Sequence, residues 1–298
     1  MRDVTGKVAF ITGGASGIGF GMARVFLRNG MKVVIADVRQ DHLDGAAAAL
    51  AGTNQDHHLM KVDVTDRQAM AQAAAETVRL YGKVHVVCNN AGVGGAAPID
   101  IAGYEDWDWV MGVNVGGIIN GVVSFLPYLK EQGEGGHIVN TSSMAGLIPL
   151  TAPGGIYSAS KFAVRGITDS LRLALAPYDI GVSVLCPGLT RSNLMDSERI
   201  RPAHLKSQAP RPARSAVAPS PSNAGMDPLE LGERVLAGIR RNDAYILPHG
   251  EFKEEVAVLF EEILAGFPAG QEIDPGRREF EERRRAATRE AKARITTG

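Results

Sequence analysis

The sequence predicts an α/β protein in which one domain, residues 1–298, contains a doubly wound parallel sheet. Short β-branched or aliphatic runs alternate with stretches of helical spacing through the first two-thirds of the chain. These runs are apolar at every position, as in strands that helices cover on both faces of a sheet. A glycine-rich turn joins the first run to the first helical stretch, as a tight strand-to-helix connection requires.

Five strands and five helices account for the first part of the chain. The strands are expected at Val8–Ile11, Val33–Ala36, Val84–Cys88, His137–Val139 and Val182–Leu185. The helices are expected at 17–30, 41–51, 66–81, 104–131 and 157–178. A helix at 228–241 and a short strand at Ala244–Leu247 resume the alternation after a break.

The alternation is interrupted over residues 193–227, which are rich in Ser, Ala, Arg and Pro. Irregular loops of this length usually bind a ligand, cover one or are disordered. We therefore expect a substrate loop or lid here, with a plain surface insertion as the alternative. Residues 249–298 are expected to form a helical C-terminal extension. Its Arg283–Arg285 run is interleaved with glutamates, which favours a solvated face or a subunit contact over a nucleic-acid surface.

Composition and charge limit the classes of function. With 45% hydrophobic residues and a formal net charge of −1, we expect a soluble protein that neither nucleic acid nor an anionic membrane attracts. Two cysteines, Cys88 and Cys186, are too few for a disulfide framework and indicate a reducing compartment. We recognise no signal peptide, membrane span or metal-ligand pattern, so a cytoplasmic protein that binds a small molecule is expected.

The glycine-rich turn at 12–19 reads Thr-Gly-Gly-Ala-Ser-Gly-Ile-Gly. A pyrophosphate is bound by backbone N–H groups at a helix N-terminus, where side chains must not intervene. Because a strand precedes the turn and a helix follows it, the turn predicts a dinucleotide site on a Rossmann-type sheet rather than a glycine-rich loop without function. The residues expected against the cofactor are Gly13, Ser16, Gly17, Ile18 and Gly19.

Asp37 ends the second expected strand, eighteen residues after Gly19. In dinucleotide sites an acidic residue about 20 residues beyond the glycines accepts the ribose hydroxyls and repels a 2′-phosphate. We therefore expect NAD as the cofactor. Arg39 leaves NADP as the less favoured alternative, because a guanidinium at that place accommodates a phosphate.

Tyr157 and Lys161 are four residues apart at the start of an expected helix, which puts the phenol and the ammonium on one helix face. A phenol of pKa about 10 is a weak base at neutral pH, and a neighbouring cation lowers that pKa. The pair is therefore a candidate acid–base centre. Taken alone, it is equally typical of a packed tyrosine beside a solvated lysine.

Several motifs follow one another in a fixed order. They are Thr-Gly-x-x-x-Gly-Ile-Gly at 12–19, Asn89-Asn90-Ala91-Gly92, Asn114, Ser142-Ser143, Tyr157 with Lys161, and Pro187-Gly188. This combination resembles the short-chain dehydrogenase/reductase family in its shorter form. The resemblance covers residues 4–192 densely and continues more loosely to about 248. It implies hydride transfer between a nicotinamide cofactor and an alcohol or ketone.

The resemblance also implies a role for each catalytic candidate. Tyr157 corresponds to the general acid/base, and Lys161 to the residue that lowers its pKa and holds the nicotinamide ribose. Ser143, rather than Ser142, corresponds to the residue that hydrogen-bonds the substrate oxygen. Asn114 corresponds to the residue that binds a water linking Lys161 to solvent, with a packing amide as the alternative.

Further cofactor contacts are implied by position. Asp63 and Val64 match the adenine contact, and the loop after the third expected strand matches the adenosine side. The turn after the fifth expected strand matches the segment around the nicotinamide. The residues in these two segments are Asn90, Ala91, Gly92, Pro187, Gly188 and Thr190, beside Tyr157 and Lys161 themselves.

The substrate is expected to be a bulky, aryl-bearing secondary alcohol or ketone. The loops near Ser143 and Tyr157 supply an apolar lining: Val93, Leu147, Leu189, Leu194 and Met195. An anionic substrate remains the alternative, because the same region contains Arg191, Arg199 and Arg201. Five segments also resemble, more weakly, the subgroup of lignin β-aryl ether Cα-dehydrogenases: 8–17, 35–39, 108–121, 197–203 and 243–248.

Other functions remain open at this stage. The same family acts on sterols, polyols and 3-oxoacyl groups. Its extended branch contains epimerases and dehydratases, but that branch usually has a different glycine spacing and a larger C-terminal domain. A non-catalytic dinucleotide sensor is the third alternative, although such proteins lose a catalytic residue. The resemblance further implies a homo-oligomer, a tetramer or dimer, that assembles through the fourth and fifth helices.

Overall fold

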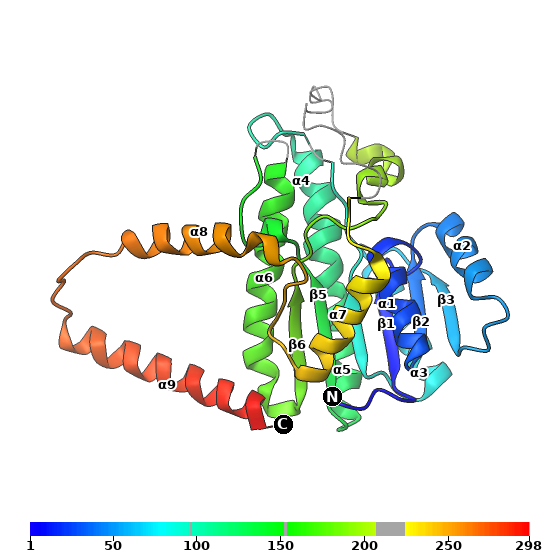
Figure 1. Cartoon of the computed structure of the whole chain (residues 1–298), viewed down its shortest axis with the longest axis horizontal. Helices are drawn as coiled ribbons and strands as arrows, with labels where there is room; N and C mark the ends of the chain where they lie inside the picture. The colour runs from blue at the N-terminus through cyan, green and yellow to red at the C-terminus, as the bar shows by residue number, and fades with distance from the viewer. Residues whose placement is uncertain (96, 152–153, 207–223, 298) are drawn as a thin grey trace.

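A seven-stranded parallel sheet forms the centre of the molecule (Figure 1), in the order β3-β2-β1-β4-β5-β6-β7. The computed structural model describes residues 1–95, 97–151, 154–206 and 224–297. The strands are β1 (Val8–Thr12), β2 (Lys32–Asp37), β3 (His57–Lys61), β4 (Val86–Asn89), β5 (Gly136–Thr141), β6 (Ile180–Leu185) and β7 (Tyr245–Ile246). The doubly wound parallel sheet predicted from the sequence is confirmed.

Helices cover both faces of this sheet. They are α1 (Gly17–Arg28), α2 (Gln40–Leu50), α3 (Arg67–Tyr81), α4 (Tyr104–Met111), α5 (Gly117–Glu131), α6 (Gly155–Leu175), α7 (Pro228–Arg241), α8 (Lys253–Ala265) and α9 (Pro275–Thr297). The core on one face includes α1, α2 and α7, and the core on the other face includes α3, α4, α5 and α6.

Each central strand contributes alternate side chains to the two cores. In β1, Ala9 and Ile11 belong to one core and Phe10 to the other, and all three are fully buried. Phe10 also packs on Phe125 of α5, with ring centroids 4.4 Å apart. A strand that is buried on both sides must be apolar at every position, which explains the continuous runs in the sequence.

Strand β3 is absent from the sequence-based prediction. Its residues, His57 to Lys61, pair in parallel with β2 at the edge of the sheet and are only partly buried or exposed. The run His-His-Leu-Met-Lys lacks the unbroken apolar character of the inner strands. An edge strand has only one neighbour and less burial, so polar residues are tolerated there.

The stretch 104–131, predicted as one helix, is interrupted by a π-helical turn, η1 (Gly112–Gly116). The whole run is long and apolar enough to cross a membrane by length and composition. In the structure its apolar residues pack in the core beside α3, α6 and β4, and Phe125 and Leu129 are fully buried. The run is therefore a core helix. Single π-helical turns are frequent at functional sites, and Asn114 lies in this one.

The described beginning of the 193–227 segment is firmly attached to the domain. It forms two short 3₁₀ helices, η5 (Leu194–Ile200) and η6 (Ala203–Leu205), and η6 lies against α4. Ser197 exchanges hydrogen bonds with the backbone of Gly94, at 2.8 and 3.1 Å. Positions 207–223, which the lid prediction includes, lie outside the described residues.

Arg201 is a buried structural residue, which corrects its sequence-based interpretation as a surface charge or an anion ligand. Its guanidinium donates to the Asp106 carboxylate at 2.8 Å, and neither side chain is exposed. A buried charge without its partner costs about 3–5 kcal/mol. The pair therefore fixes the 193–206 segment on α4. Arg191 pairs with Asp227 across the base of the same segment.

The C-terminal extension is helical, as predicted, and projects from the domain as an arm (Figure 1). Helix α8 runs outward from the end of the sheet near β7, and α9 runs back so that its last turns lie near the far end of α6. We call the two helices and the connection between them, residues 253–297, the arm.

Candidate active site

The candidate catalytic residues meet above the carboxyl ends of β4, β5 and β6. Ser143 follows β5, Asn114 lies in η1, and Tyr157 and Lys161 lie in the first two turns of α6. The chain order of the strands reverses between β1 and β4. Clefts for ligands in open parallel sheets form at this reversal, outside the carboxyl ends of the strands.

Lys161 is buried, with 3% of its surface exposed. Its Nζ atom donates to the carbonyl oxygen of Thr141 at 3.0 Å and lies 5.4 Å from the centre of the Tyr157 ring. Burial lowers the pKa of Lys161 to about 8, because the apolar surroundings disfavour the charged form. The Lys161 side chain therefore changes between its charged and its neutral form near physiological pH.

Tyr157 lies beside Ser143, and burial raises the pKa of its phenol to about 12. The Ser143 hydroxyl acts in the opposite direction, because a hydrogen bond to the phenol oxygen stabilises the phenolate. The sequence assigns that stabilisation to Lys161. In the structure, the stabilising contact comes from Ser143, and desolvation of the phenol outweighs it. Lys161 is itself buried and therefore less inclined to carry charge.

The two neighbouring serines have different surroundings. Ser142 is 1% exposed, and its hydroxyl donates to the backbone oxygen of Lys161 at 2.8 Å. Ser143 is partly exposed; its Oγ accepts from the Ala145 N–H at 3.1 Å and lies 3.4 Å from the Pro187 oxygen. Ser142 therefore ties β5 to α6, whereas Ser143 faces the Tyr157 phenol.

Asn114 is fully buried, and its amide is bonded on both sides. Its Oδ1 accepts from the Val93 N–H at 2.8 Å, and its Nδ2 donates to the Val93 oxygen at 3.0 Å and to Ser160 Oγ at 3.0 Å. A Cβ built on Gly92 would lie 3.2 Å from Asn114 Oδ1 and 3.4 Å from Lys161 Nζ. The absent side chain at Gly92 keeps these two polar atoms accessible to each other.

The glycine-rich turn has the backbone that its sequence indicates. Gly13 and Gly17 have φ angles of +60° and +48°, which residues with a side chain rarely adopt. A Cβ on Gly19 would lie 2.1 Å from the Gly13 oxygen. Ser16 precedes the first turn of α1 and forms no side-chain cap with it. The first N–H groups of α1, at Gly17 and Ile18, are thus left for a bound anion.

Thr12, which the sequence analysis did not single out, joins this turn to the loop after β4. Its Oγ1 accepts from the N–H groups of Asn90 and Ala91 at 2.9 and 3.0 Å. The Asn90 side chain donates in turn to the oxygens of Thr12 and Gly13, at 3.1 and 3.3 Å. Threonine before a glycine-rich turn is the only sequence signal for this role.

Asp37 lies at the carboxyl end of β2, with 7% of its surface exposed. Its carboxylate accepts from the N–H groups of Arg39 at 3.0 Å and of Ala15 at 3.4 Å. The Arg39 guanidinium donates to Asp41, with one contact of 3.0 Å. An arginine engaged by a carboxylate is less available to a phosphate than its position in the sequence indicates.

Asp63 and Val64 follow β3. The Asp63 carboxylate is exposed and accepts from the N–H and the hydroxyl of Thr65, at 2.9 and 2.7 Å. Val64 is buried, and its oxygen accepts from Asn120 Nδ2 at 2.8 Å. The structure therefore assigns Asp63 a turn-forming contact, and its exposed carboxylate stands at the same edge of the sheet as Asp37.

His249 is a second residue that the sequence analysis missed. Its buried imidazole accepts from the Gly188 N–H through Nδ1 at 3.0 Å, and its Nε2 lies 3.1 Å from the Leu189 oxygen. Both contacts together require the neutral form with the proton on Nε2. Thr190 completes this turn, with its hydroxyl 3.4 Å from the Gly188 oxygen. No local sequence signal predicts the contact, because it joins residues about sixty positions apart.

The expected substrate-lining residues differ in how far they are exposed. Val93 and Leu147 are buried, at 2% and 5% exposure, whereas Leu189 is 55% exposed. Leu194 lies against Gly94, 3.6 Å from a Cβ built there. The side chain of Met195 lies outside the described part of the structure.

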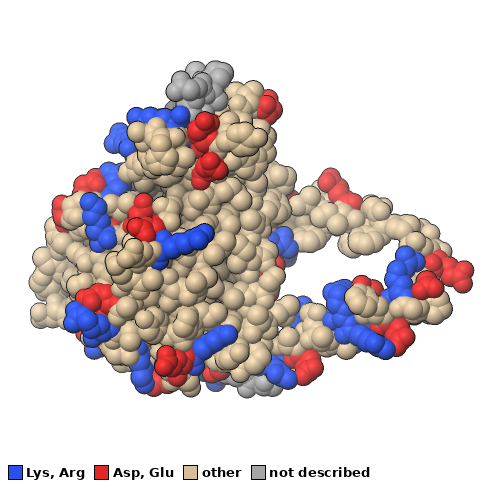
Figure 2. Space-filling view, turned by 180° about the vertical axis from the view of Figure 1, so that it is seen from behind, with Lys and Arg blue, Asp and Glu red and all other residues tan. Residues whose placement is uncertain are grey.

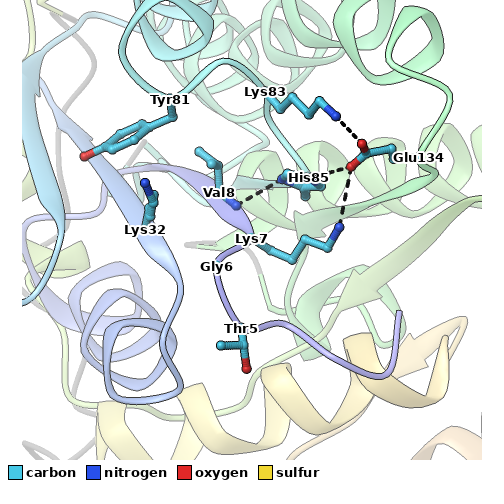
Figure 3. A pocket seen from close by; sticks show the side chains of 9 residues that line it. All are labelled: Thr5, Gly6, Lys7, Val8, Lys32, Tyr81, Lys83, His85 and Glu134. Atoms are coloured by element: carbon cyan, nitrogen blue, oxygen red, sulfur yellow. Dashed lines mark hydrogen bonds and ion pairs between the residues drawn. The ribbon is translucent and has the colours of Figure 1, made fainter.

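A separate cavity of about 290 Å³ opens at the opposite edge of the sheet, at the amino ends of β1, β2 and β4. Figure 3 shows Lys7, Lys83 and His85 directed at Glu134 from three sides. Because Glu134 pairs with the ammonium groups of Lys7 and Lys83 and contacts the His85 ring, these residues form an ion-pair network at the surface beside the cavity. It is remote from Tyr157 and takes no part in the candidate active site.

Comparison with known proteins identifies the family. The family model described as short chain dehydrogenase matches residues 7–202. The C alpha-dehydrogenase of Sphingobium sp. (strain NBRC 103272 / SYK-6) is 39% identical over 278 residues, which cover 92% of this chain and 90% of that protein. The chain belongs to the short-chain dehydrogenase/reductase family.

Solved structures of other short-chain dehydrogenases agree with this assignment. One from Novosphingobium aromaticivorans aligns with a TM-score of 0.83 at 38% identity, over 99% of this chain and 100% of its own. One from Burkholderia phymatum, in complex with NAD, aligns with a TM-score of 0.84 at 33% identity, over 92% of this chain and 100% of its own. As a short-chain dehydrogenase, the protein is an oxidoreductase that uses a nicotinamide dinucleotide.

The residues of this short-chain dehydrogenase fit such a cofactor. The open first turn of α1 suits a pyrophosphate, and a Cβ on Gly17 would lie 2.9 Å from Ser192, so only a glycine leaves room there. The buried carboxylate of Asp37 stands at the end of the neighbouring strand, where a ribose is bound in this class of sheet.

Proposed function

We propose that the protein oxidises a bulky, aryl-bearing secondary alcohol to its ketone with NAD, and catalyses the reverse reduction with NADH. The observation that carries this proposal is the partly buried Tyr157 phenol, hydrogen-bonded by Ser143 and flanked by the buried Lys161. A proton donor and an oxyanion-stabilising hydroxyl then face the same substrate oxygen.

In the oxidation, the Tyr157 oxygen removes the proton of the substrate hydroxyl, and Ser143 holds the oxygen while its carbon becomes a carbonyl. A nicotinamide dinucleotide, which the glycine-rich turn, Asp37 and Lys161 would hold, would supply the hydride acceptor for that carbon. In the reduction, Tyr157 returns its proton to the forming alkoxide. Because burial raises the pKa of Tyr157 to about 12, the resting phenol is protonated and must lose its own proton before it accepts one from the substrate. The acceptor is the neutral form of Lys161, which a pKa of about 8 makes accessible near physiological pH.

Asn114 is assigned the position of a proton-relay residue in this proposal. Its amide is fixed by Val93 and Ser160, so Oδ1 has one lone pair left for a water directed toward Lys161. Gly92 separates the two polar groups without a side chain. The relay passes the proton from Tyr157 to solvent through Lys161.

Tyr157→Phe is expected to lower kcat by about 10²–10⁴-fold, the contribution typical of general acid–base catalysis. The affinity for NADH, measured by fluorescence titration, should stay within a few-fold of wild type.

Ser143→Ala is expected to lower kcat by about 10²–10³-fold. The matched control, Ser142→Ala, should cost far less in turnover, since its hydroxyl contacts the α6 backbone and the Cys186 thiol and not Tyr157. The reverse order for the two serines would contradict the assignment.

The preference for NAD over NADP rests on Asp37 and on the pairing of Arg39 with Asp41. A 2′-phosphate at this place would face the buried carboxylate of Asp37. The only near guanidinium in the described residues of the β2–α2 turn is already engaged by Asp41. Both effects disfavour NADP.

Asp37→Ser is expected to lower the ratio of kcat/KM for NAD to that for NADP by about tenfold or more, the equivalent of about 1.4 kcal/mol. Adding Asp41→Ala should lower the ratio further, because it releases Arg39 for the phosphate. Steady-state rates with both cofactors measure the ratio, and Asp44→Ala on the same helix is the control. A wild-type enzyme that uses both cofactors equally would contradict the proposal.

His249 is assigned the role of a positioning residue for the turn around the nicotinamide. It bonds one N–H and one carbonyl of that turn, and a Cβ on Gly188 would lie 3.0 Å from the imidazole. An unsatisfied buried N–H costs about 1–3 kcal/mol. The turn after β6 is therefore held in one conformation by a side chain that follows the neighbouring strand, β7.

His249→Ala is expected to weaken NADH binding by roughly tenfold, in line with a loss of about 1.4 kcal/mol. His249→Gln retains one donor and one acceptor and should restore part of the affinity. Thermal unfolding separates this effect from general destabilisation, and His58→Ala on the edge strand is the control. An unchanged NADH affinity in a folded His249→Ala protein would show that the turn holds itself.

The proposed substrate class rests on the lining and on one relative. The C alpha-dehydrogenase of Sphingobium is similar over nine-tenths of the chain, and the loop side chains Val93, Leu189 and Leu194 are apolar. Arg201, one of the three arginines that leave an anionic substrate as an alternative, is paired inside the protein. We propose residues 193–227 as the segment that covers this substrate, in a cytoplasmic enzyme of one domain.

A panel of alcohols, followed by NADH absorbance, tests the substrate class. Bulky 1-aryl secondary alcohols are expected to exceed 2-hydroxy acids, sugars and polyols in kcat/KM by about tenfold or more, because apolar burial contributes about 25 cal/mol per Å². Sterols and 3-oxoacyl thioesters in the same panel represent the other substrate classes of the family. If a polyol or a hydroxy acid is preferred, the substrate assignment is wrong and the hydride chemistry is unaffected.

A further inference from the structure

The arm exposes an apolar stripe that the rest of the described structure covers only at its inner end, where Val256 packs on the domain and Arg165 lies over the Phe260 ring. Along α8, apolar residues recur at Val256, Leu259, Phe260, Ile263 and Leu264 and continue at Phe267, with the spacing i, i+3, i+4, i+7, i+8 and i+11. Such spacing marks the side of a helix that packs on a partner. Yet Phe260, Ile263, Leu264 and Phe267 are 42%, 52%, 65% and 69% exposed.

The helix α8 needs a partner to be stable. Within the described residues, α8 has no buried side chain. It has 13 residues, and isolated helices of about 12–15 residues are marginal in water. Figure 2 shows the arm standing away from the domain, with an opening between them, so the domain leaves the arm largely uncovered.

The two helices of the arm carry opposite charge. Helix α8 contains four glutamates and one lysine, Lys253, whereas α9 contains seven arginines and one lysine against four glutamates. In Figure 2, blue side chains gather over the lower limb of the arm, which is α9. Part of that charge is paired within α9, as in Arg283 with Glu279 and Arg284 with Glu281, and a basic excess remains.

We propose that the arm docks on the arm of a second copy of this chain, with α8 of each copy against α9 of the other. A twofold axis makes the two contacts equivalent, so one pairing satisfies the acidic and the basic helix of both copies at once. The apolar stripe and Phe280 of α9, which is 67% exposed, are then covered by the partner. This contact is separate from the fourth and fifth expected helices, 104–131 and 157–178, through which the family resemblance implies assembly.

The exposed apolar area of the arm is of the size that a specific interface needs. A fully buried aromatic side chain removes about 150–250 Å² from water. The exposed parts of Phe260, Phe267 and Phe280 in two copies thus supply on the order of 600 Å². The aliphatic residues of the stripe add to this, toward the ~1,200–2,000 Å² of a stable interface. The opposite net charges select this pairing over two α8 helices in contact.

The first test removes the apolar stripe. Leu264→Asp places a charge in the contact, and Ala265→Asp places the same charge on an exposed position off the stripe. Sedimentation velocity of the full chain is expected to show wild type and Ala265→Asp in one assembly, with Leu264→Asp in a species of half that mass. Thermal unfolding checks that all three fold alike. If Leu264→Asp sediments as wild type does, or if wild type is a monomer, the proposal is overturned.

The second test reverses charge on one helix at a time. A chain with Glu254, Glu255, Glu261 and Glu262 changed to Lys has two basic arm helices, and a chain with Arg283, Arg284 and Arg285 changed to Glu has lost the basic excess of α9. Each alone is expected to assemble less than wild type. Their equimolar mixture should regain the full mass, because α8 of one then meets α9 of the other with opposite charge. If the mixture keeps the lower mass of the single variants, or if each variant alone reaches the wild-type mass, the α8–α9 pairing is refuted.

Discussion

Parallel pairing of the central strands is the constraint on which the rest of the molecule depends. Since β1, β4, β5 and β6 run in one direction, every loop that follows a strand emerges at one edge of the sheet. The glycine turn, the Gly92 loop, Ser143 and the Pro187 turn therefore meet although they are far apart in the chain. The helices supply the remaining groups, because α6 begins at this edge and η1 lies beside it.

Burial then sets the chemical character of the site. The same desolvation that raises the pKa of Tyr157 to about 12 lowers that of Lys161 to about 8. Both groups are thereby driven toward their neutral forms, and the two pKa values, which nearly coincide in water, move apart. The buried site therefore favours a protonated phenol beside a neutral lysine, and transfer of the phenol proton to Lys161 costs free energy that it would not cost in water.

Residues that do not touch the reaction hold the reacting ones in place. Thr12 binds the loop after β4, Ser142 binds the α6 backbone, and His249 binds the turn after β6. Each is a short polar side chain that satisfies a buried backbone group, which costs free energy if left unpaired. The arm is the exception in the molecule, since most of its apolar side chains have no such partner within the described chain and imply one outside it.

By itself, the sequence determined the sheet, most of its strands and the family, because continuous apolar runs and a glycine turn are local patterns. The Tyr157–Lys161 pair was equally visible, since one helical turn relates the two residues. Only the tertiary structure decided that Arg201 is buried against Asp106 and that His249 supports Gly188. The edge strand β3 also belongs to this group. These features depend on which distant surfaces meet, and side-chain burial and pairing across the fold are not encoded in any local spacing.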